Sequence, residues 1–212
     1  MVWLYPHERR LRRNRRLVLG ALLLLGFLFV SAADAWLWKK LTLAEGVKMR
    51  DWYQALRAGG YLPVWILFGI GLVLHDAREA RLASRRLGPG VLARGVLLVV
   101  SAKLSGLIAE LAKVVIQRHR PHGDGAYTFA WTTDVPGVGI GTVSSHAAVA
   151  FGAAFMLGRL NPAWRWPALF IATGCGLSRL FSGAHFASDV YAAAVVSYAV
   201  AWMLPLPARP PR

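Results

Sequence analysis

The sequence predicts an all-α integral membrane protein built as a bundle of six transmembrane helices. Hydrophobic residues make up 56% of the 212 residues, and the mean hydropathy is +0.44, which exceeds the usual apolar share of a soluble domain. These residues form six long runs, and arginines flank several of them, as expected of membrane spans. The runs cover about 17–33, 59–75, 91–116, 144–160, 165–177 and 189–206.

The first 16 residues are strongly basic and precede the first apolar run. They hold six arginines against a single acidic residue, Glu8. A basic start before an apolar stretch is also the pattern of a signal peptide. Because Ser31-Ala32-Ala33 is a weak cleavage site and further hydrophobic runs follow it, we expect a retained first span behind a basic cytoplasmic segment, 1–16.

The segment 34–60 mixes aromatic and basic residues, which is compatible both with an interfacial helix and with a polar connector. The second run, 59–75, is shorter than the roughly 20 residues that a helix needs to cross a bilayer. Residues 76–90 follow it as a predicted basic loop that closes on Gly-Pro-Gly.

The third run, 91–116, contains three ionisable residues, Lys103, Glu110 and Lys113. Their spacings of seven and three residues place them on one broad face of a helix. Ionisable groups inside a span usually face protein or water and usually pair. We therefore expect a structural ion pair between Lys103 and Glu110.

A long glycine-containing loop, 117–143, separates the third and fourth runs. Tyr127, Phe129 and Trp131 alternate in it, which is compatible with a short strand or with an aromatic edge over a lipid tail. The Gly-x-Gly-x-Gly at 137–141 follows no clear strand, so a nucleotide-binding loop is disfavoured. The loop is compatible with a flexible lid and, almost as well, with a plain connector.

The last three runs are closely spaced. The turn Asn161-Pro162-Ala163-Trp164 joins the fourth to the fifth, and the sixth ends at a Pro/Arg-rich tail, 207–212, which we expect to be flexible. The predicted membrane domain is therefore 17–206. The single cysteine, Cys175, lies inside an apolar run and excludes an intrachain disulfide.

The distribution of basic residues predicts the orientation in the membrane. Six spans place both termini on one side, which then carries 14 basic residues in its segments and loops, against 8 on the other side. The positive-inside rule places the termini in the cytoplasm. The end of span three, the start of span four and the connector between spans five and six then meet at the outer face.

Three polar stretches fall at these three places. The first is Lys113 to Pro121, K-x6-R-P; the second is Val143-Ser144-Ser145-His146; the third is Ser178 to Asp189, S-R-x5-H-x3-D. In the third, an arginine suited to clamping a phosphate precedes a histidine and an aspartate spaced four apart, which share a face if helical. A carboxylate there can hold one imidazole nitrogen protonated and leave the other free to attack. Taken alone, this stretch is also compatible with a polar connector near a membrane surface.

Together and in this order, the three stretches resemble the signature motifs of the type 2 phosphatidic acid phosphatase superfamily. That family runs K-x6-R-P, then P-S-G-H, then S-R-x5-H-x3-D. The first and third motifs match fully, whereas Val143 replaces the proline and Ser145 the glycine of the second. Since glycine permits close approach of a backbone amide to phosphate, we expect Ser145 to alter efficiency or substrate choice without removing the chemistry.

The resemblance implies a metal-independent lipid phosphatase with defined residue roles. His185 would attack phosphorus and form a phosphohistidine, Asp189 would hold its tautomer, and His146 would protonate the leaving alkoxide and then activate water. No metal or other cofactor is expected, because His119 and His122 with Asp124 lack the further ligands of a metal site. The residues expected to bind the substrate phosphate are Lys113, Arg120, Ser144, Ser145 and Arg179.

The expected substrate is a lipid phosphate or diphosphate at the headgroup level. Candidates are phosphatidic acid, phosphatidylglycerophosphate, undecaprenyl diphosphate and the lipid A phosphates. The net charge of +15 fits a bilayer and an anionic lipid substrate, and no nucleic-acid partner is expected, because the arginines flank apolar runs. The expected location is a bacterial-type inner membrane with the active site on the periplasmic or extracellular face. No oligomeric state is predicted.

Two other functions fit part of the pattern. The same pocket holds vanadate in the related haloperoxidases, but those enzymes are soluble and six spans argue against them. A non-enzymatic transporter or anionic-lipid-binding protein would need the arginines, but it would not need His185 together with Asp189.

Overall fold

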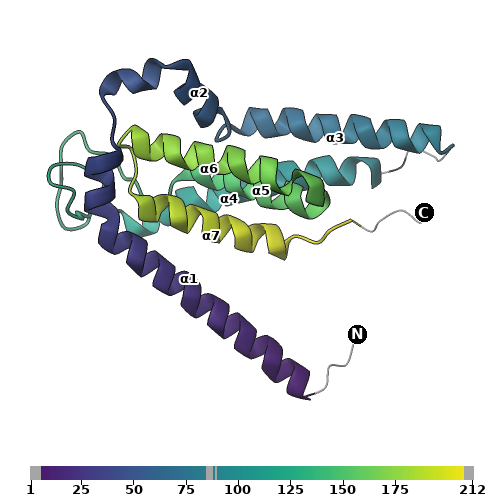
Figure 1. The fold of residues 1–212 in the computed structure, drawn as a ribbon, viewed down its shortest axis with the longest axis horizontal. Coiled ribbons are helices and arrows are strands. Elements are labelled where there is room, and N and C mark those ends of the chain that lie inside the picture. Colours follow the sequence, from purple (N-terminus) through teal and green to yellow (C-terminus); the bar gives the residue numbers. More distant parts are fainter. Residues whose placement is uncertain (1–5, 85–87, 89, 208–212) are drawn as a thin grey trace.

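The computed structural model describes residues 6–84, 88 and 90–207, and α-helices dominate it (Figure 1). Two 3-10 helices, Glu45–Met49 (η1) and Pro162–Trp164 (η2), interrupt the connections. The α-helices are α1 (Pro6–Leu41), α2 (Asp51–Ala58), α3 (Leu62–Leu82), α4 (Gly90–Ile116), α5 (Ser145–Leu160), α6 (Arg165–Phe181) and α7 (Ala187–Met203).

Helix α5 forms the centre of the bundle and packs against α4, α6 and α7. Its inward face is made of small residues, including the fully buried Ala147, Ala150 and Ala154. Hydroxyls of neighbouring helices bond to its backbone: Ser101 Oγ donates to the Gly152 carbonyl at 2.8 Å and Ser197 Oγ to that of Ala148 at 2.9 Å. Small residues let the helix backbones approach closely, and hydrogen bonds from hydroxyl groups join the helices. Both stabilise helix packing in a bilayer, where the hydrophobic effect does not drive helices together.

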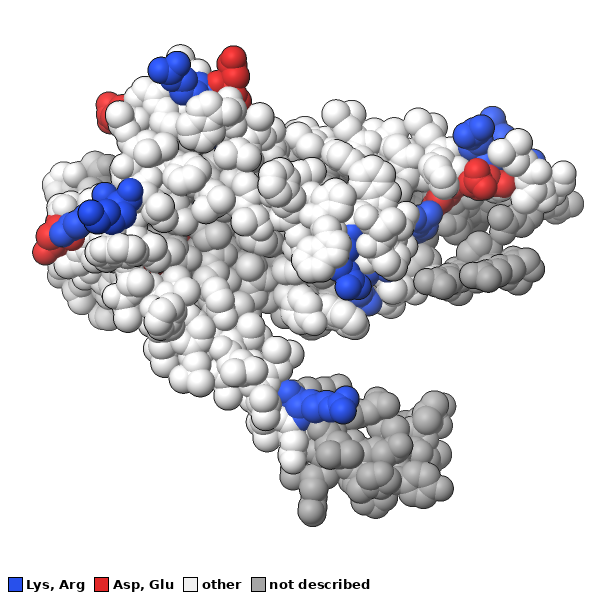
Figure 2. All heavy atoms as spheres, viewed as in Figure 1, with Lys and Arg blue, Asp and Glu red and all other residues white. Residues whose placement is uncertain are grey.

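Helix α1 diverges from the bundle, and its contacts are mainly with α7 (Figure 1). Its apolar side chains are largely exposed: Leu17 is 65%, Leu22 61% and Phe29 77% accessible. On the face drawn in Figure 2, uncharged side chains cover most of the helices, and charged residues gather near their ends. Exposed apolar surface of this extent fits a lipid environment.

Two helical segments are long and apolar enough to cross a bilayer, Leu17–Leu41 and Gly90–Ile116. A third crossing results if α2 and α3, which are bent by 60° at their junction, count as one span. Helices α5, α6 and α7 have 16 or 17 residues, which gives about 25 Å against a hydrocarbon core of about 30 Å. The structure therefore supports a helical membrane protein, and the count of six spans remains a prediction.

Several predicted boundaries change in the structure. The segment 34–60, left open between an interfacial helix and a connector, divides into the end of α1, then η1 and α2. The predicted loop 76–90 is wrong over 76–82, which continue α3, because this stretch is rich in good helix formers and Arg94 of α4 binds Asp76 at 2.7 Å. Predictions that involve 1–5, 85–87, 89 and 208–212, and the side chains of 6–13 and of Arg16, lie outside the described residues.

The expected ion pair between Lys103 and Glu110 is wrong. Glu110 Oε1 instead accepts a hydrogen bond from Lys113 Nζ at 2.8 Å. On a helix, a spacing of three residues separates side chains by about one turn, whereas seven residues span about 10 Å of helix axis. Lys103 is exposed on α4.

Backbone hydrogen bonds fold the loop 117–143 back on itself. His119 N donates to the Thr128 carbonyl at 2.8 Å, and Gly141 N donates to the Arg118 carbonyl at 2.8 Å. The bridges Arg118–Phe129 and His119–Ile140 are isolated, so of the two alternatives for Tyr127, Phe129 and Trp131 the short strand is not formed in this loop as the structure describes it. The loop lies over the end of the bundle at which α4 ends and α5 begins (Figure 1).

Candidate active site

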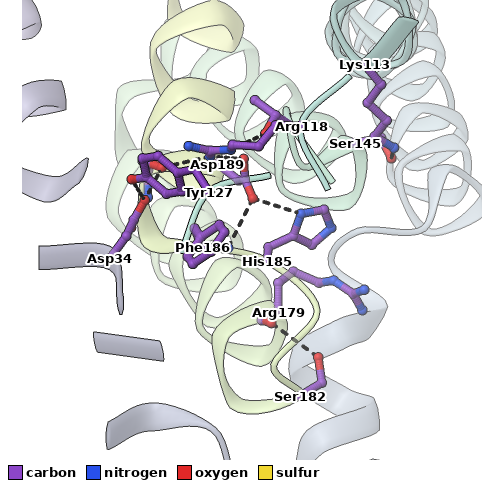
Figure 3. A network of polar contacts seen from close by, with 12 residues as sticks. Asp34, Lys113, Arg118, Tyr127, Ser145, Arg179, Ser182, His185, Phe186 and Asp189 are labelled. Carbon is purple, nitrogen blue, oxygen red and sulfur yellow. Dashed lines mark hydrogen bonds and ion pairs between the residues drawn. The ribbon is translucent and has the colours of Figure 1, made fainter. Parts of the chain in front are cut away.

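The three polar stretches meet at one end of the bundle, opposite the end at which α7 finishes (Figures 1 and 3). Lys113 lies in the last turn of α4, and Ser144 is the residue that precedes α5. Arg179 lies in the last turn of α6, His185 in the turn that follows, and Asp189 in the first turn of α7. Residues separated by up to 76 positions thus surround one region, as the predicted topology required.

His185 lies outside helix α7, so it does not share a helical face with Asp189. Gly183, with φ of +65°, forms the turn that returns the chain, and Ala184 N donates to the Arg179 carbonyl at 3.1 Å. His185 Nδ1 lies 3.4 Å from Asp189 Oδ2, and both side chains are buried. Since Nδ1 faces the carboxylate, Nε2 is the nitrogen left for chemistry.

Asp189 is held by groups other than histidine. Arg118 Nη2 donates to its Oδ1 at 2.5 Å, and the backbone N–H of Phe186 donates to its Oδ2 at 3.0 Å. Arg118 Nε also donates to Thr142 Oγ1 at 2.6 Å. Sequence analysis gave Arg118 no role, although it lies two residues before Arg120 in the first motif.

The network continues into helix α1 through Asp34, which is 1% exposed (Figure 3). Its Oδ1 accepts from Ser188 N at 2.9 Å, and its Oδ2 accepts from Ser188 Oγ and, at 2.7 Å, from Tyr127 OH. Burial, and then the hydrogen bond to Asp34, raise the pKa of Tyr127, which keeps its hydroxyl a donor. Because Ser188 Oγ also accepts from Arg118 Nη2 at 2.9 Å, α1 is linked to the group that holds Asp189.

Buried side-chain donors without a hydrogen-bond partner in the described part of the chain include Ser144 Oγ, Arg179 Nε and Arg57 Nε. His185 Nδ1 lacks one too, since its 3.4 Å contact with Asp189 Oδ2 does not have hydrogen-bond geometry. A serine that precedes a helix usually caps it, but Ser144 does not, so its hydroxyl remains available. Leaving a buried polar group unsatisfied costs about 1–3 kcal/mol. An anion bound between Ser144 and Arg179 would give both donors a partner.

Ser145 begins α5 and has no positive φ, so replacement of the family's glycine carries no backbone strain. Its hydroxyl accepts a hydrogen bond from Lys113 Nζ at 3.0 Å. Ser145 and Glu110 together therefore fix the direction of the Lys113 side chain. Val143, at the position of the family's proline, is buried against Ala147 and Ala148.

Arg120 is positioned by the loop that covers the site. Its backbone N–H donates to the Gly139 carbonyl at 2.9 Å, and a Cβ built on Gly141 would lie 3.2 Å from its Cα and Cγ. Within the described ranges, no carboxylate lies within salt-bridge distance of Arg120 or Arg179.

Sequence analysis also missed two residues of the α2–α3 junction. The ring of Tyr61 lies 5.5 Å from the ring of His146, edge to face, and Arg57 Cζ lies 5.4 Å from the centre of the Tyr61 ring. No short motif marks either residue, and both lie more than 80 positions before His146 in the chain.

His119 and His122 join a hydrogen-bonded chain beside the site. His122 Nδ1 donates to the Arg120 carbonyl at 2.8 Å, and Thr128 Oγ1 lies 3.1 Å from His119 Nδ1 and 3.3 Å from His122 Nε2. Metal independence stays a prediction.

A separate cavity of about 460 Å³ lies between α3, α4 and η2, is lined by Gly71 and Arg94 among others, and includes none of the predicted site residues.

The pH dependence of the site follows from His185. Burial lowers its pKa below the ordinary 6.5, and Asp189 opposes this shift. The neutral imidazole is the nucleophilic form, so a lowered pKa keeps His185 reactive at pH values below 6.5. We expect kcat/KM to fall only as the pH drops through this lowered pKa. Asp189→Asn should move the acid limb to still lower pH, measured against wild type on one substrate, and a move to higher pH would contradict this assignment.

A family model described as PAP2 superfamily matches residues 94–207. The crystal structure of the first transmembrane PAP2 type phosphatidylglycerolphosphate phosphatase, from Bacillus subtilis, is similar with a TM-score of 0.58 and 20% identity, covering 86% of this chain and 92% of that one. The crystal structure of Aquifex aeolicus LpxE gives a TM-score of 0.42 and 14% identity, covering 71% and 90%. No curated protein matches the chain.

Proposed function

Because the chain belongs to the PAP2 superfamily, we propose that it is a metal-independent membrane phosphatase that removes a phosphate group from a lipid phosphate or diphosphate through a phosphohistidine. The observation that carries the proposal is the buried pair of His185 and Asp189, 3.4 Å apart, beside the unpartnered donors Ser144 Oγ and Arg179 Nε. A transporter or lipid-binding protein has no need of an oriented imidazole among anion-binding groups.

In the first step, Nε2 of His185 attacks phosphorus opposite the leaving oxygen. Asp189 holds the Nδ1 proton and stabilises the positive charge that develops on the ring. Arg120, Arg179 and Lys113 offset the charge of the phosphoryl oxygens, with Ser144 Oγ and the first amides of α5 as further donors. His146 protonates the leaving alkoxide.

In the second step, His146 takes a proton from water, which attacks the phosphohistidine. The bond between phosphorus and Nε2 breaks, inorganic phosphate leaves, and His185 returns to its neutral form. The cations of the site supply the charge stabilisation that divalent ions provide in other phosphatases.

A lipid substrate fits the position of the site at the end of apolar helices. Phosphatidic acid, phosphatidylglycerophosphate, undecaprenyl diphosphate and the lipid A phosphates carry the required headgroup chemistry. We expect the purified protein to release phosphate from one or more of them in detergent, and activity should survive EDTA and be inhibited by vanadate. Loss of activity in EDTA with rescue by magnesium would overturn metal independence. Binding of these lipids without phosphate release would favour the lipid-binding alternative.

We further propose a six-span domain, 17–206, in a bacterial-type inner membrane, with cytoplasmic termini and the site outside. Cysteines introduced at Thr132 of the site loop and at Ser84 after α3 test this orientation, since both positions are exposed and the native Cys175 is buried. An impermeant thiol reagent should label Thr132→Cys in intact cells and label Ser84→Cys only after lysis. The reverse pattern would show the opposite orientation.

A further inference from the structure

We propose that Arg57 binds the second phosphate of a lipid diphosphate on the leaving-group side of the site, so that the enzyme prefers diphosphates to monophosphates of the same lipid. This inference rests on the proposed phosphatase function and adds a residue from α2, which lies outside the matched family region 94–207.

The junction between α2 and α3 fixes Arg57 in place. Gly59 and Gly60 lie against α5 and α6 so closely that a Cβ on Gly60 would be 2.9 Å from His146 Cβ and 2.9 Å from Cys175 Sγ. Trp65, fully buried, donates from Nε1 to the Gly59 carbonyl at 2.7 Å. Arg57, two residues before Gly59 in the last turn of α2, is therefore carried by a packed element and not by a mobile loop.

Arg57 lies on the side of the site that His146 occupies. Its guanidinium carbon is 5.4 Å from the centre of the Tyr61 ring, which in turn meets the ring of His146 edge to face at 5.5 Å. His146 is the proposed donor to the leaving oxygen, and the Tyr61 ring lies between it and Arg57, so Arg57 is one aromatic ring away from the leaving-group side of the site. The Nε of Arg57 is buried and has no partner in the described structure, which leaves a donor for a ligand.

The charges of the site match a diphosphate better than a monophosphate. Lys113 is paired with Glu110 and Arg118 with Asp189. Over residues 6–84, 88 and 90–207, Arg57, Arg120 and Arg179 have no carboxylate within 4.0 Å. A phosphate monoester carries about −1.5 to −2 at pH 7, and a diphosphate monoester carries about one further negative charge. The second phosphate of a diphosphate therefore gives Arg57 an anionic partner, in addition to the phosphate that Arg120 and Arg179 bind.

The chemistry differs between the two substrates in the leaving group. With a diphosphate, Nε2 of His185 bonds to the terminal phosphorus while the bond from that phosphorus to the bridging oxygen breaks. The electron pair stays on the bridging oxygen of the lipid monophosphate, where Arg57 offsets the new charge. Water then cleaves the phosphohistidine and releases inorganic phosphate. A lipid monophosphate instead expels an alkoxide, which needs the proton of His146.

The test uses two substrates with one tail, farnesyl diphosphate and farnesyl monophosphate. Arg57→Gln should lower kcat/KM for the diphosphate about ten- to a hundredfold, the usual effect of losing a charge-assisted hydrogen bond, and change the monophosphate less than about threefold. The matched control is Arg50→Gln, an exposed arginine seven positions earlier, which should behave as wild type. In His146→Ala, the rate of phosphoenzyme formation should fall more for the monophosphate than for the diphosphate. Equal losses of Arg57→Gln on both substrates, or no loss, would overturn the proposal.

A binding measurement separates this proposal from the proposed function. Wild-type protein in detergent should bind inorganic pyrophosphate about tenfold or more tightly than orthophosphate in a calorimetric titration, and Arg57→Gln should lose that difference. If wild type hydrolyses neither lipid, the phosphatase proposal fails while this comparison still decides the role of Arg57. If Arg57→Gln still binds pyrophosphate more tightly than orthophosphate, the role proposed for Arg57 is wrong. Arg57→Lys keeps the charge and should retain part of the preference for pyrophosphate.

Discussion

Replacing His185 with alanine is expected to remove phosphate release and the covalent phosphoenzyme together. His185 supplies the attacking nitrogen. Asp189 lies 3.4 Å from the other ring nitrogen of His185, and without the imidazole it has no nucleophile to orient. We expect turnover to fall by about 10⁴-fold or more. The measurement is acid-labile, base-stable radiolabel on the protein after a brief pulse with a labelled substrate. Label on His185→Ala equal to that on wild type would assign the nucleophile elsewhere, and His146 would be the next candidate.

The matched variant is His146→Ala, which keeps the nucleophile and removes the proposed acid and base. An aryl phosphate has a good leaving group and needs little proton donation in the first step. With that substrate, His146→Ala should become labelled but should release phosphate about 10²–10⁴-fold more slowly than wild type. Label that appears and decays at wild-type rates would contradict the role given to His146.

Replacing Arg118 with leucine is expected to be the most destabilising single change at the site. The variant leaves Asp189, which is 0% exposed, without the guanidinium that now binds it at 2.5 Å. Breaking one partner from a buried ion pair costs about 3–5 kcal/mol, which corresponds to a fall in the unfolding midpoint of roughly 10 °C for a chain of this size. Activity should fall as well, because Asp189 then loses one of the two donors that fix its carboxylate beside His185. The midpoint is measured by thermal unfolding in detergent, with the exposed Arg50→Leu as control.

The double variant Arg118→Leu/Asp189→Leu separates stability from catalysis. Removing both charges takes away the uncompensated carboxylate, so most of the lost unfolding midpoint should return. Activity should not return, because His185 lacks its orienting carboxylate. A double variant as unstable as Arg118→Leu would show that Arg118 acts through Thr142 and Ser188 and not through the charge of Asp189.

The long helices could be predicted from the sequence because their cause is local. A segment that crosses a bilayer must satisfy its own backbone and present apolar side chains, so one uninterrupted apolar run specifies one helix. The run predicted at 91–116 is α4, Gly90–Ile116, and the run at 144–160 is α5, Ser145–Leu160. The end of α3 was predicted less well. The charged residues at 76–82 suggested a loop between two spans, but most of them also have a high helix propensity and here continue the helix.

The grouping of the motif residues could also be predicted, because alternating helix directions place every second connection on the same face. This argument needs only the number and order of the helices. It predicted that Lys113, Ser144, His146, Arg179 and His185 approach one another. The structure places the segments that carry them, which are the end of α4, the start of α5 and the connector between α6 and α7, at one end of the bundle (Figure 1).

Only the tertiary structure decided which groups support that site. Asp34 binds Ser188 across 154 positions, Arg118 binds Asp189 across 71, and Tyr61 meets His146 from a different helix junction. It also decided that Lys113 pairs with Glu110 and Ser145 while Lys103 stays exposed. Hydropathy and motif spacing are properties of neighbouring residues, whereas these contacts depend on helix rotation and on how closely small residues let helices approach. The sequence by itself determined the helices and the chemistry of the motifs, and packing determined which buried charges orient them.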